Sequence, residues 1–198
     1  MSFSKSLGLF AVLLSFLLLA SPLLARAHEE LSVVKEPFIV SDPNNDLNEE
    51  RSVVAVDNNG NAHLIWIDGS GYSLFYAMFD PDGNQLIAPT ELLNGVGSYK
   101  YRKPKLAVDD SNCLHIVYHS EAAEVGYLKV DPYRDDLDGD EADPANIIVV
   151  EPTIVSVEDD VRSVSPAIAT GSAVHIVWRD GSYDEQGAIW YTKLDEDG

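Results

Sequence analysis

Three stretches of the chain share one pattern of apolar and polar positions. They are 52–68 (SVVAVDNNGNAHLIWID), 104–120 (PKLAVDDSNCLHIVYHS) and 165–181 (SPAIATGSAVHIVWRDG). In each stretch, two short apolar runs flank a turn rich in Asn, Asp, Gly or Ser, which is typical of two β-strands joined by a hairpin. The second run is apolar on both faces, and this predicts a strand that is covered from both sides.

The pattern continues beyond each stretch and defines a unit of short strands. A histidine recurs in the second strand of every unit (His63, His115, His175), an aromatic residue follows it three positions later, and a tyrosine marks the third strand. The predicted strands are 52–56, 62–67, 74–79 and 85–93; 105–108, 113–119, 125–130 and 147–155; and 167–170, 173–179 and 188–194. Four-stranded units that recur every 40–60 residues or so are typical of β-propellers. We therefore predict an all-β protein, a partial β-propeller of about three four-stranded blades near 52–93, 104–156 and 165–198.

The two ends of this repeat predict an incomplete ring. The third unit lacks a fourth strand, whereas residues 31–40 (LSVVKEPFIV) resemble an outer strand without its blade. Three blades are fewer than the four to eight or so of closed propellers. We expect either a part of a longer propeller with further blades, or self-association in which copies exchange the 31–40 strand.

The N-terminus has the pattern of a secretory signal peptide over residues 1–27. Lys5 precedes an apolar run at 7–20, and Ala25-Arg26-Ala27 fits the small-x-small cleavage rule. The alternative, a membrane anchor, needs about 20 apolar residues. We expect a secreted or periplasmic protein that begins at His28 and has no membrane contact after cleavage.

Composition excludes one class of partner. The chain carries 33 acidic and 13 basic residues, a formal net charge of −20. Nucleic-acid binding relies on basic side chains that neutralise phosphates, so no nucleic-acid partner is expected. Cys113 is the single cysteine, which rules out an internal disulfide.

The motif A-V-D-x-x-G-x-x-H-x-x-W-x-D followed by Tyr resembles the repeat of sialidase-like six-bladed β-propellers of secreted prokaryotic proteins. Here it begins at Val54 and runs through His63 and Trp66 to Tyr76. The turn Asp80-Pro81-Asp82-Gly83 departs from the Asp-box of true sialidases. Sialidases hold a substrate carboxylate with three arginines, and the resemblance implies that role for Arg51, Arg102 and Arg162, each shortly before a first strand. The alternative is that these arginines balance neighbouring acids.

An acidic run at 131–143 lies between the third and fourth strands of the second unit. Asp136, Asp138 and Asp140 alternate around Gly139, and Asp143 follows them. Carboxylates in this arrangement can supply the oxygen ligands of Ca²⁺. The alternative is an acidic loop that is only solvated.

These features favour a secreted non-catalytic β-propeller that serves as a binding or interaction module, with Ca²⁺ as its candidate cofactor and a carbohydrate or a protein as its partner. The three histidines fit a repeated structural hydrogen bond better than a shared site. The alternative function is a sialidase-like glycoside hydrolase, although no complete catalytic set can be assigned. A third alternative is a structural set of blades within a larger assembly.

Overall fold

The computed structural model describes residues 35–41, 49–68, 73–95, 104–120, 124–156, 166–179 and 187–195. All of them belong to the unit Val34–Gly198. The predicted signal peptide at 1–27 and the residues Arg102 and Arg162 lie outside the described residues.

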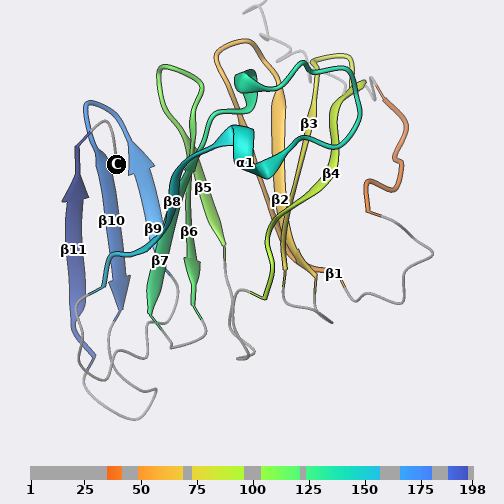
Figure 1. Cartoon of the computed structure of the whole chain (residues 1–198). Coiled ribbons are helices and arrows are strands. Elements are labelled where there is room, and N and C mark those ends of the chain that lie inside the picture. Colours follow the sequence, from red (N-terminus) through yellow and green to blue (C-terminus); the bar gives the residue numbers. More distant parts are fainter. Residues whose placement is uncertain are drawn as a thin grey trace, which may run out of the picture. The chain divides into compact units, whose positions relative to one another are not determined.

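The described strands form three antiparallel sheets in which chain neighbours are sheet neighbours (Figure 1). Sheet 1 contains β1 (Glu49–Val56), β2 (Ala62–Asp68), β3 (Leu74–Phe79) and β4 (Gln85–Leu93). Sheet 2 contains β5 (Lys105–Val108), β6 (Leu114–His119), β7 (Val125–Val130) and β8 (Ile148–Ile154). Sheet 3 contains β9 (Ala167–Thr170), β10 (Val174–Arg179) and β11 (Ile189–Leu194). The all-β class is confirmed, and each predicted strand of the three units lies on an observed one.

Side-chain caps shape the first turn of sheets 1 and 2. In sheet 1 the Asp57 Oδ1 atom accepts hydrogen bonds from the backbone N–H groups of Asn59 and Asn61, both at 2.8 Å. In sheet 2 the Asp109 Oδ1 atom accepts from Ser111 N at 2.8 Å and from Cys113 N at 2.9 Å. Aspartate favours such turns because its short side chain can bond to the backbone ahead of it. The β9–β10 turn is two residues shorter and has Gly171 where the other turns have Asp.

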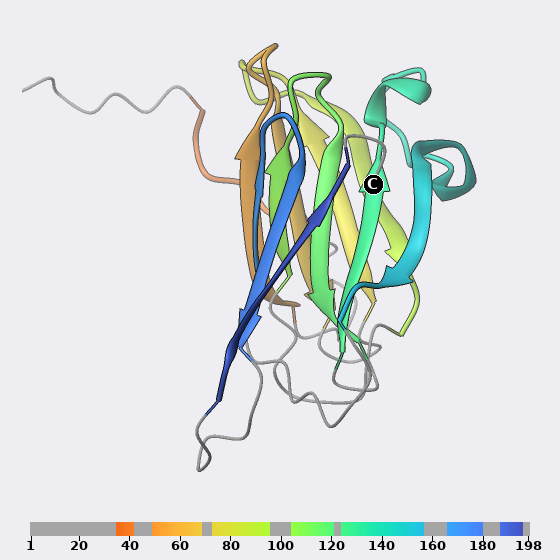
Figure 2. The same cartoon turned by 90° about the vertical axis from the view of Figure 1, so that its left-hand side faces the viewer.

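Each sheet has one face that carries the recurring histidine, which we call its His face. The His face of sheet 1, with Ile65 and Tyr76, packs against the opposite face of sheet 2, with Ile116 and Tyr118, in one buried cluster. The His face of sheet 2, with Val117, Val125 and Tyr127, packs in the same way against Val174, Ile176 and Trp178 of sheet 3. Sheet 2 therefore lies between the other two, as Figure 2 also shows. The side chains of β2 and β6 are apolar on both faces because both of their faces are covered.

The His face of sheet 3 is exposed in the part of the chain that the structure describes. Val177 is 39% exposed, Tyr191 57% and Ile189 75%. Their counterparts in sheet 2, namely Val117, Tyr127 and Val125, are 0–1% exposed. The same sequence pattern thus gives a core where another sheet follows and an open apolar surface where none is described.

The predicted outer strand at 31–40 has no strand structure over its described part, residues 35–41. Instead, this segment packs on sheet 1: the Phe38 ring meets the Phe79 ring edge-on at 5.5 Å, and Val40 packs against Trp66. Pro37 lacks the N–H group that a strand ladder needs, which disfavours regular pairing here. Residues 31–34 lie outside the described part.

Two short helices interrupt the long loop between β7 and β8. They are a 3₁₀ turn, η1 (Pro132–Arg134), and a single turn, α1 (Pro144–Ile147). Each starts with a proline, and the aspartate before it accepts a backbone hydrogen bond as an N-cap, which is a favoured start for a helix. The sequence analysis predicted no helix here. Of the helices in the described residues, none has the length and apolarity to cross a membrane.

Candidate functional site

The recurring histidine forms a hydrogen bond to the recurring tyrosine in every sheet. The distance from the histidine Nδ1 atom to the tyrosine oxygen is 2.9 Å in the His63–Tyr76 and His175–Tyr191 pairs and 2.8 Å in the His115–Tyr127 pair. The strand register places the two residues on neighbouring strands and on the same face. This repeated contact is the local role that the sequence analysis assigned to the histidines.

A carboxylate extends this contact in the first two sheets. The His115 Nε2 atom lies 2.9 Å from the Asp109 Oδ2 atom, and His63 Nε2 lies 3.3 Å from Asp57 Oδ2, a longer contact outside hydrogen-bond geometry. A carboxylate only accepts, so Nε2 of His115 carries the proton and Nδ1 accepts from the tyrosine hydroxyl. We call these two chains the Asp–His–Tyr networks. Sheet 3 has no such carboxylate, since Gly171 stands at that position.

Burial fixes the charge states of these networks. It lowers the pKa of His63 and of His115, and the neighbouring carboxylates offset this only in part. Burial tends to raise the pKa of Asp109, but the hydrogen bonds from His115 and Cys113 outweigh it and the pKa falls below its ordinary value. Burial raises the pKa of Tyr127 strongly. At neutral pH the histidine is neutral and the aspartate ionised, while the tyrosine hydroxyl is held as a donor.

The network of sheet 1 is completed by a tyrosine from sheet 2. The Tyr133 hydroxyl, on η1, donates a short hydrogen bond to Asp57 Oδ2. The Tyr133 hydroxyl oxygen in turn accepts from Asn59 Nδ2 at 2.9 Å and from Asn61 Nδ2 at 2.7 Å. We call Asp57, Asn59 and Asn61 the Tyr133 socket. It joins the first turn of sheet 1 to the loop that follows β7.

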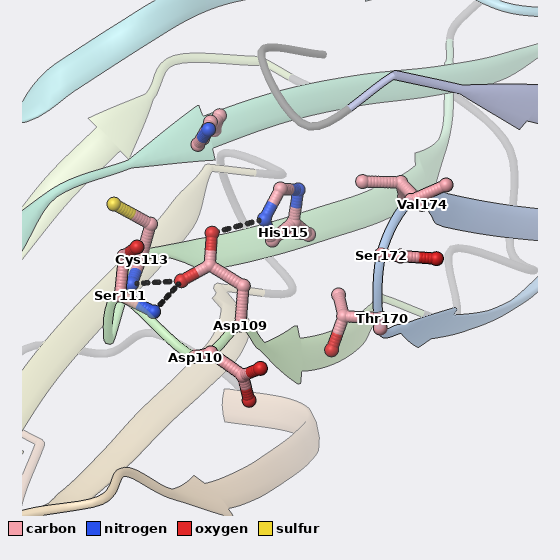
Figure 3. A pocket seen from close by; sticks show the side chains of 11 residues that line it. Asp109, Asp110, Ser111, Cys113, His115, Thr170, Ser172 and Val174 are labelled. Carbon is pink, nitrogen blue, oxygen red and sulfur yellow. Dashed lines mark hydrogen bonds and ion pairs between the residues drawn. The ribbon is translucent and has the colours of Figure 1, made fainter.

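A polar cleft of about 440 Å³ lies between sheets 2 and 3. Its walls come from the β5–β6 turn, from β6 and β7, and from the β9–β10 turn, and its lining residues are Asp109, Asp110, Ser111, Cys113, His115, Lys129 and 170–174. Figure 3 shows Asp109, Ser111 and Cys113 on one side and Thr170, Ser172 and Val174 on the other. We call this the Asp109 cleft. The sequence analysis did not predict it; the signal that could have indicated it is the match of Asp109 with Asp57 in the aligned turns.

The groups in the Asp109 cleft suit binding better than covalent chemistry. Burial and the nearby Asp109 raise the pKa of Cys113, so the thiol stays protonated and is a weak nucleophile. The Thr170 hydroxyl donates to the Val108 carbonyl at 2.7 Å and is therefore engaged. An ionised carboxylate, a thiol and hydroxyl groups together offer hydrogen bonds to a polar ligand that is neutral or cationic.

The acidic loop gathers three of its four predicted ligands. One ligand oxygen from each of Asp136, Asp138 and Asp140 lies within 4.8 Å of the others, and all three side chains are exposed. The chain reverses at Leu137 and Gly139, which have φ values of 57° and 95°, and this brings the alternate carboxylates together. The hydrogen bond to Asp138 and its negative charge raise the pKa of Asp140. This group can hold a metal ion.

Asp143 does not belong to that group. Its Oδ1 atom accepts from Ala145 N at 3.0 Å and so caps α1. The Asp-Pro start of this helical turn was taken as part of the acidic loop, and the role of Asp143 as a fourth metal ligand stays a prediction.

The acidic loop is held against β4 of sheet 1. Gly139 N donates to the Leu86 carbonyl at 3.0 Å, and Ala88 N donates to the Asp140 carbonyl at 2.6 Å. Further along, Ala142 N donates to the Thr90 hydroxyl at 3.0 Å. The loop thus extends sheet 1 beyond its fourth strand and ties two sheets together.

The predicted arginine clamp is described at one position only. Arg51 lies on β1 with a φ of 58°, where the register of β1 and β2 shifts between Glu50 and Val53. Arg102 and Arg162 lie outside the described residues. The convergence of the three arginines, and the sialidase-type activity that depends on it, stay predictions.

A scan of the sequence against models of protein families finds no match, and a search of curated proteins finds no significant relative.

Proposed function

We propose that this chain is a secreted, non-catalytic β-propeller module that functions by association, through the open His face of its third sheet. The observation that carries the proposal is the exposure of Val177, Ile189 and Tyr191 on a face whose counterparts are buried in both other sheets. The occupant we propose is a second copy of this chain.

The residues on the open His face of sheet 3 match those on the His face of sheet 2, which packs against sheet 3. The cross-strand pairs Val117–Tyr127 and His115–Lys129 in sheet 2 correspond to Val177–Tyr191 and His175–Lys193 in sheet 3. Propeller blades bury such faces by stacking on the next blade. The open His face of sheet 3 thus offers a second copy the same kind of surface that the His face of sheet 2 offers to sheet 3.

Exposed apolar area sets the scale of the driving force. Complete burial of a large apolar side chain contributes about 1.5–3 kcal/mol. Scaling by the exposed fractions of Val177 (39%), Tyr191 (57%) and Ile189 (75%) gives on the order of 3–5 kcal/mol for covering the three. Micromolar self-association needs about 8 kcal/mol, so these three side chains supply roughly half of it and the rest has to come from neighbouring side chains on the same face.

Sedimentation velocity of residues 28–198 over a range of concentrations tests the proposal. We expect association that is lost in Tyr191→Lys and Val177→Lys and retained in Thr153→Lys, a matched change on exposed β8. A wild-type chain that remains monomeric at high micromolar concentration, while circular dichroism shows folded β-structure, would overturn it.

We also propose that Ca²⁺ stabilises the module through Asp136, Asp138 and Asp140. The supporting observation is the crowding of three carboxylates, whose mutual repulsion a divalent ion would relieve. For a Kd of about 0.1 mM, 2 mM Ca²⁺ stabilises the folded state by about 1.8 kcal/mol. That corresponds to a rise in Tm of roughly 4–7 °C for a domain of this size.

Thermal unfolding with Ca²⁺, with Mg²⁺ and with a chelator measures this effect. We expect Asp138→Asn to abolish the rise in Tm caused by Ca²⁺, whereas Asp82→Asn, a turn aspartate outside the acidic loop, leaves it intact. An equal Tm in 2 mM Ca²⁺ and in chelator argues against the site.

A further inference from the structure

The turn between β1 and β2 provides an internal example of ligand recognition. The Tyr133 socket binds a phenol hydroxyl that donates to Asp57 and accepts from Asn59 and Asn61. The phenol approaches from the neighbouring sheet and meets a carboxylate whose other oxygen is already occupied by two backbone N–H groups. The socket is therefore rigid before the phenol arrives.

Asp109, in the turn between β5 and β6, is a hydrogen-bond acceptor of the same kind as Asp57. The Asp109 Oδ1 atom takes two backbone N–H groups, and Oδ2 takes His115 Nε2 at 2.9 Å. A carboxylate has about four acceptor positions, so Oδ2 keeps one that these bonds do not use. The Asp109 side chain is 16% exposed and lines the Asp109 cleft, so this position is accessible.

The Asp109 cleft lies beside Asp109, whereas the equivalent aspartate of sheet 1, Asp57, has Tyr133 beside it. Tyr133 follows the last residue of β7, Val130, by three positions, and the position that follows Leu194 of β11 by three is Asp197. By its sequence Asp197 is not a hydroxyl donor, and it lies outside the described residues. On the facing wall, the short β9–β10 turn has Gly171 in place of an aspartate, which leaves room beside Asp109.

We infer that the Asp109 cleft is a binding site for the phenol group of a neutral aromatic alcohol, such as an exposed tyrosine side chain. Its hydroxyl donates to Asp109 Oδ2 as the Tyr133 hydroxyl donates to Asp57. The volume of about 440 Å³ is within the range of small-ligand pockets and accommodates one aromatic ring. The two carboxylates of Asp109 and Asp110 outnumber the one ammonium group of Lys129 in the lining, which favours a neutral ligand over an anionic one. This site is independent of the open His face of sheet 3.

The affinity is expected to be modest and to depend on the hydroxyl group. A hydrogen bond to an ionised group typically changes affinity by about tenfold to 100-fold. Ser111 and Cys113 stand where the Tyr133 socket has Asn59 and Asn61, so this cleft lacks the two amide donors that hold the Tyr133 oxygen. Restoring one of them should therefore tighten binding.

An NMR titration of ¹⁵N-labelled residues 28–198 with N-acetyl-L-tyrosinamide tests the inference. We expect saturable shifts with a millimolar Kd, concentrated in the amides of 109–113 and 171–174. N-acetyl-L-phenylalaninamide, which lacks only the hydroxyl, should bind at least tenfold more weakly. Methyl α-D-glucoside, an aliphatic hydroxyl donor, serves as the carbohydrate comparison and should produce no saturable shift.

Three variants locate the contact. Asp109→Asn removes the ionised acceptor and should weaken tyrosinamide binding about tenfold. Cys113→Asn adds the amide of the Tyr133 socket and should tighten binding at least threefold. Asp82→Asn changes an exposed turn aspartate of sheet 1 outside the cleft and should bind like the wild type.

Equal binding of the phenylalanine and tyrosine amides overturns the inference, as does stronger binding of the glucoside. A tyrosinamide Kd that is the same in Cys113→Asn and in the wild type also counts against it. This variant keeps the test decisive if Asp109→Asn fails to fold. The absence of any saturable shift in both the wild type and Cys113→Asn refutes the site.

Discussion

Removal of the Tyr133 hydroxyl is the sharpest test of how the sheets are joined. In Tyr133→Phe the ring remains, but Asp57 loses a charge-assisted hydrogen bond, and Asn59 and Asn61 lose a shared acceptor. A hydrogen bond to a charged group contributes about 1.5–3 kcal/mol net. Tyr133 is only half-buried, so water can replace part of this, and we expect a loss of about 2 kcal/mol. The corresponding fall in Tm is roughly 4–8 °C.

Urea unfolding followed by circular dichroism measures the change in the free energy of unfolding. Tyr191→Phe is the matched control, because its hydroxyl contacts His175 on the exposed His face of sheet 3, and it should cost less than about 1 kcal/mol. In a double-mutant cycle, Tyr133→Phe and Asp57→Asn should show a coupling of at least about 1 kcal/mol. A Tyr133→Phe protein within about 0.5 kcal/mol of the wild type would refute the reasoning, because surface changes of no consequence fall in that range.

Further outcomes follow from burial and charge. A Cβ added at Gly126 would overlap the Tyr118 ring; we expect Gly126→Ala to destabilise the fold by about 1–3 kcal/mol, and Tyr118→Leu to relieve most of this loss in the double variant. Val117→Ala should cost about 2–3 kcal/mol, whereas Val177→Ala should cost under about 1 kcal/mol in the monomer, because only Val117 is buried; equal costs would contradict the assignment of covered and open faces. The Asp–His–Tyr networks should make the fold sensitive to acid. Their histidine pKa values are lowered, so the unfolded chain takes up protons first, and stability should be present above pH 6.5 and fall as the pH decreases below it. The lowered aspartate pKa values add a second loss below about pH 3.8. A free energy of unfolding that is constant from pH 7.5 to 5 would show that these histidines do not resist protonation.

Local patterns predicted the strands well. The apolar run at β6 indicated a strand covered on both sides, and Leu114–His119 is buried at every position. The turn chemistry around Asp57 and Asp109 marked the hairpins correctly, because an aspartate side chain acts on the backbone within a few residues. Such information is local in the chain, and so the sequence contains it.

The candidate metal site was predicted from positions that are close in the chain. Asp136, Asp138 and Asp140 were predicted together because alternate positions of one loop stay close, whereas the acidic pattern did not indicate that Asp143 caps a helical turn. Residues 31–40 were expected to form a strand, but the described residues 35–41 pack on sheet 1 without one.

Local sequence patterns specify which residues form strands, which turns join them, and where a histidine and a tyrosine recur on one face. What each face packs against depends on how the three sheets are arranged in space. Val117 and Val177 occupy the same position in the repeat, yet one is buried and the other is 39% exposed. Asp57 and Asp109 make the same turn, yet Tyr133 fills the space beside Asp57, while a cleft opens beside Asp109. The physical reason is that burial and hydrogen-bond completion depend on the neighbouring sheet, whose position a local pattern does not encode.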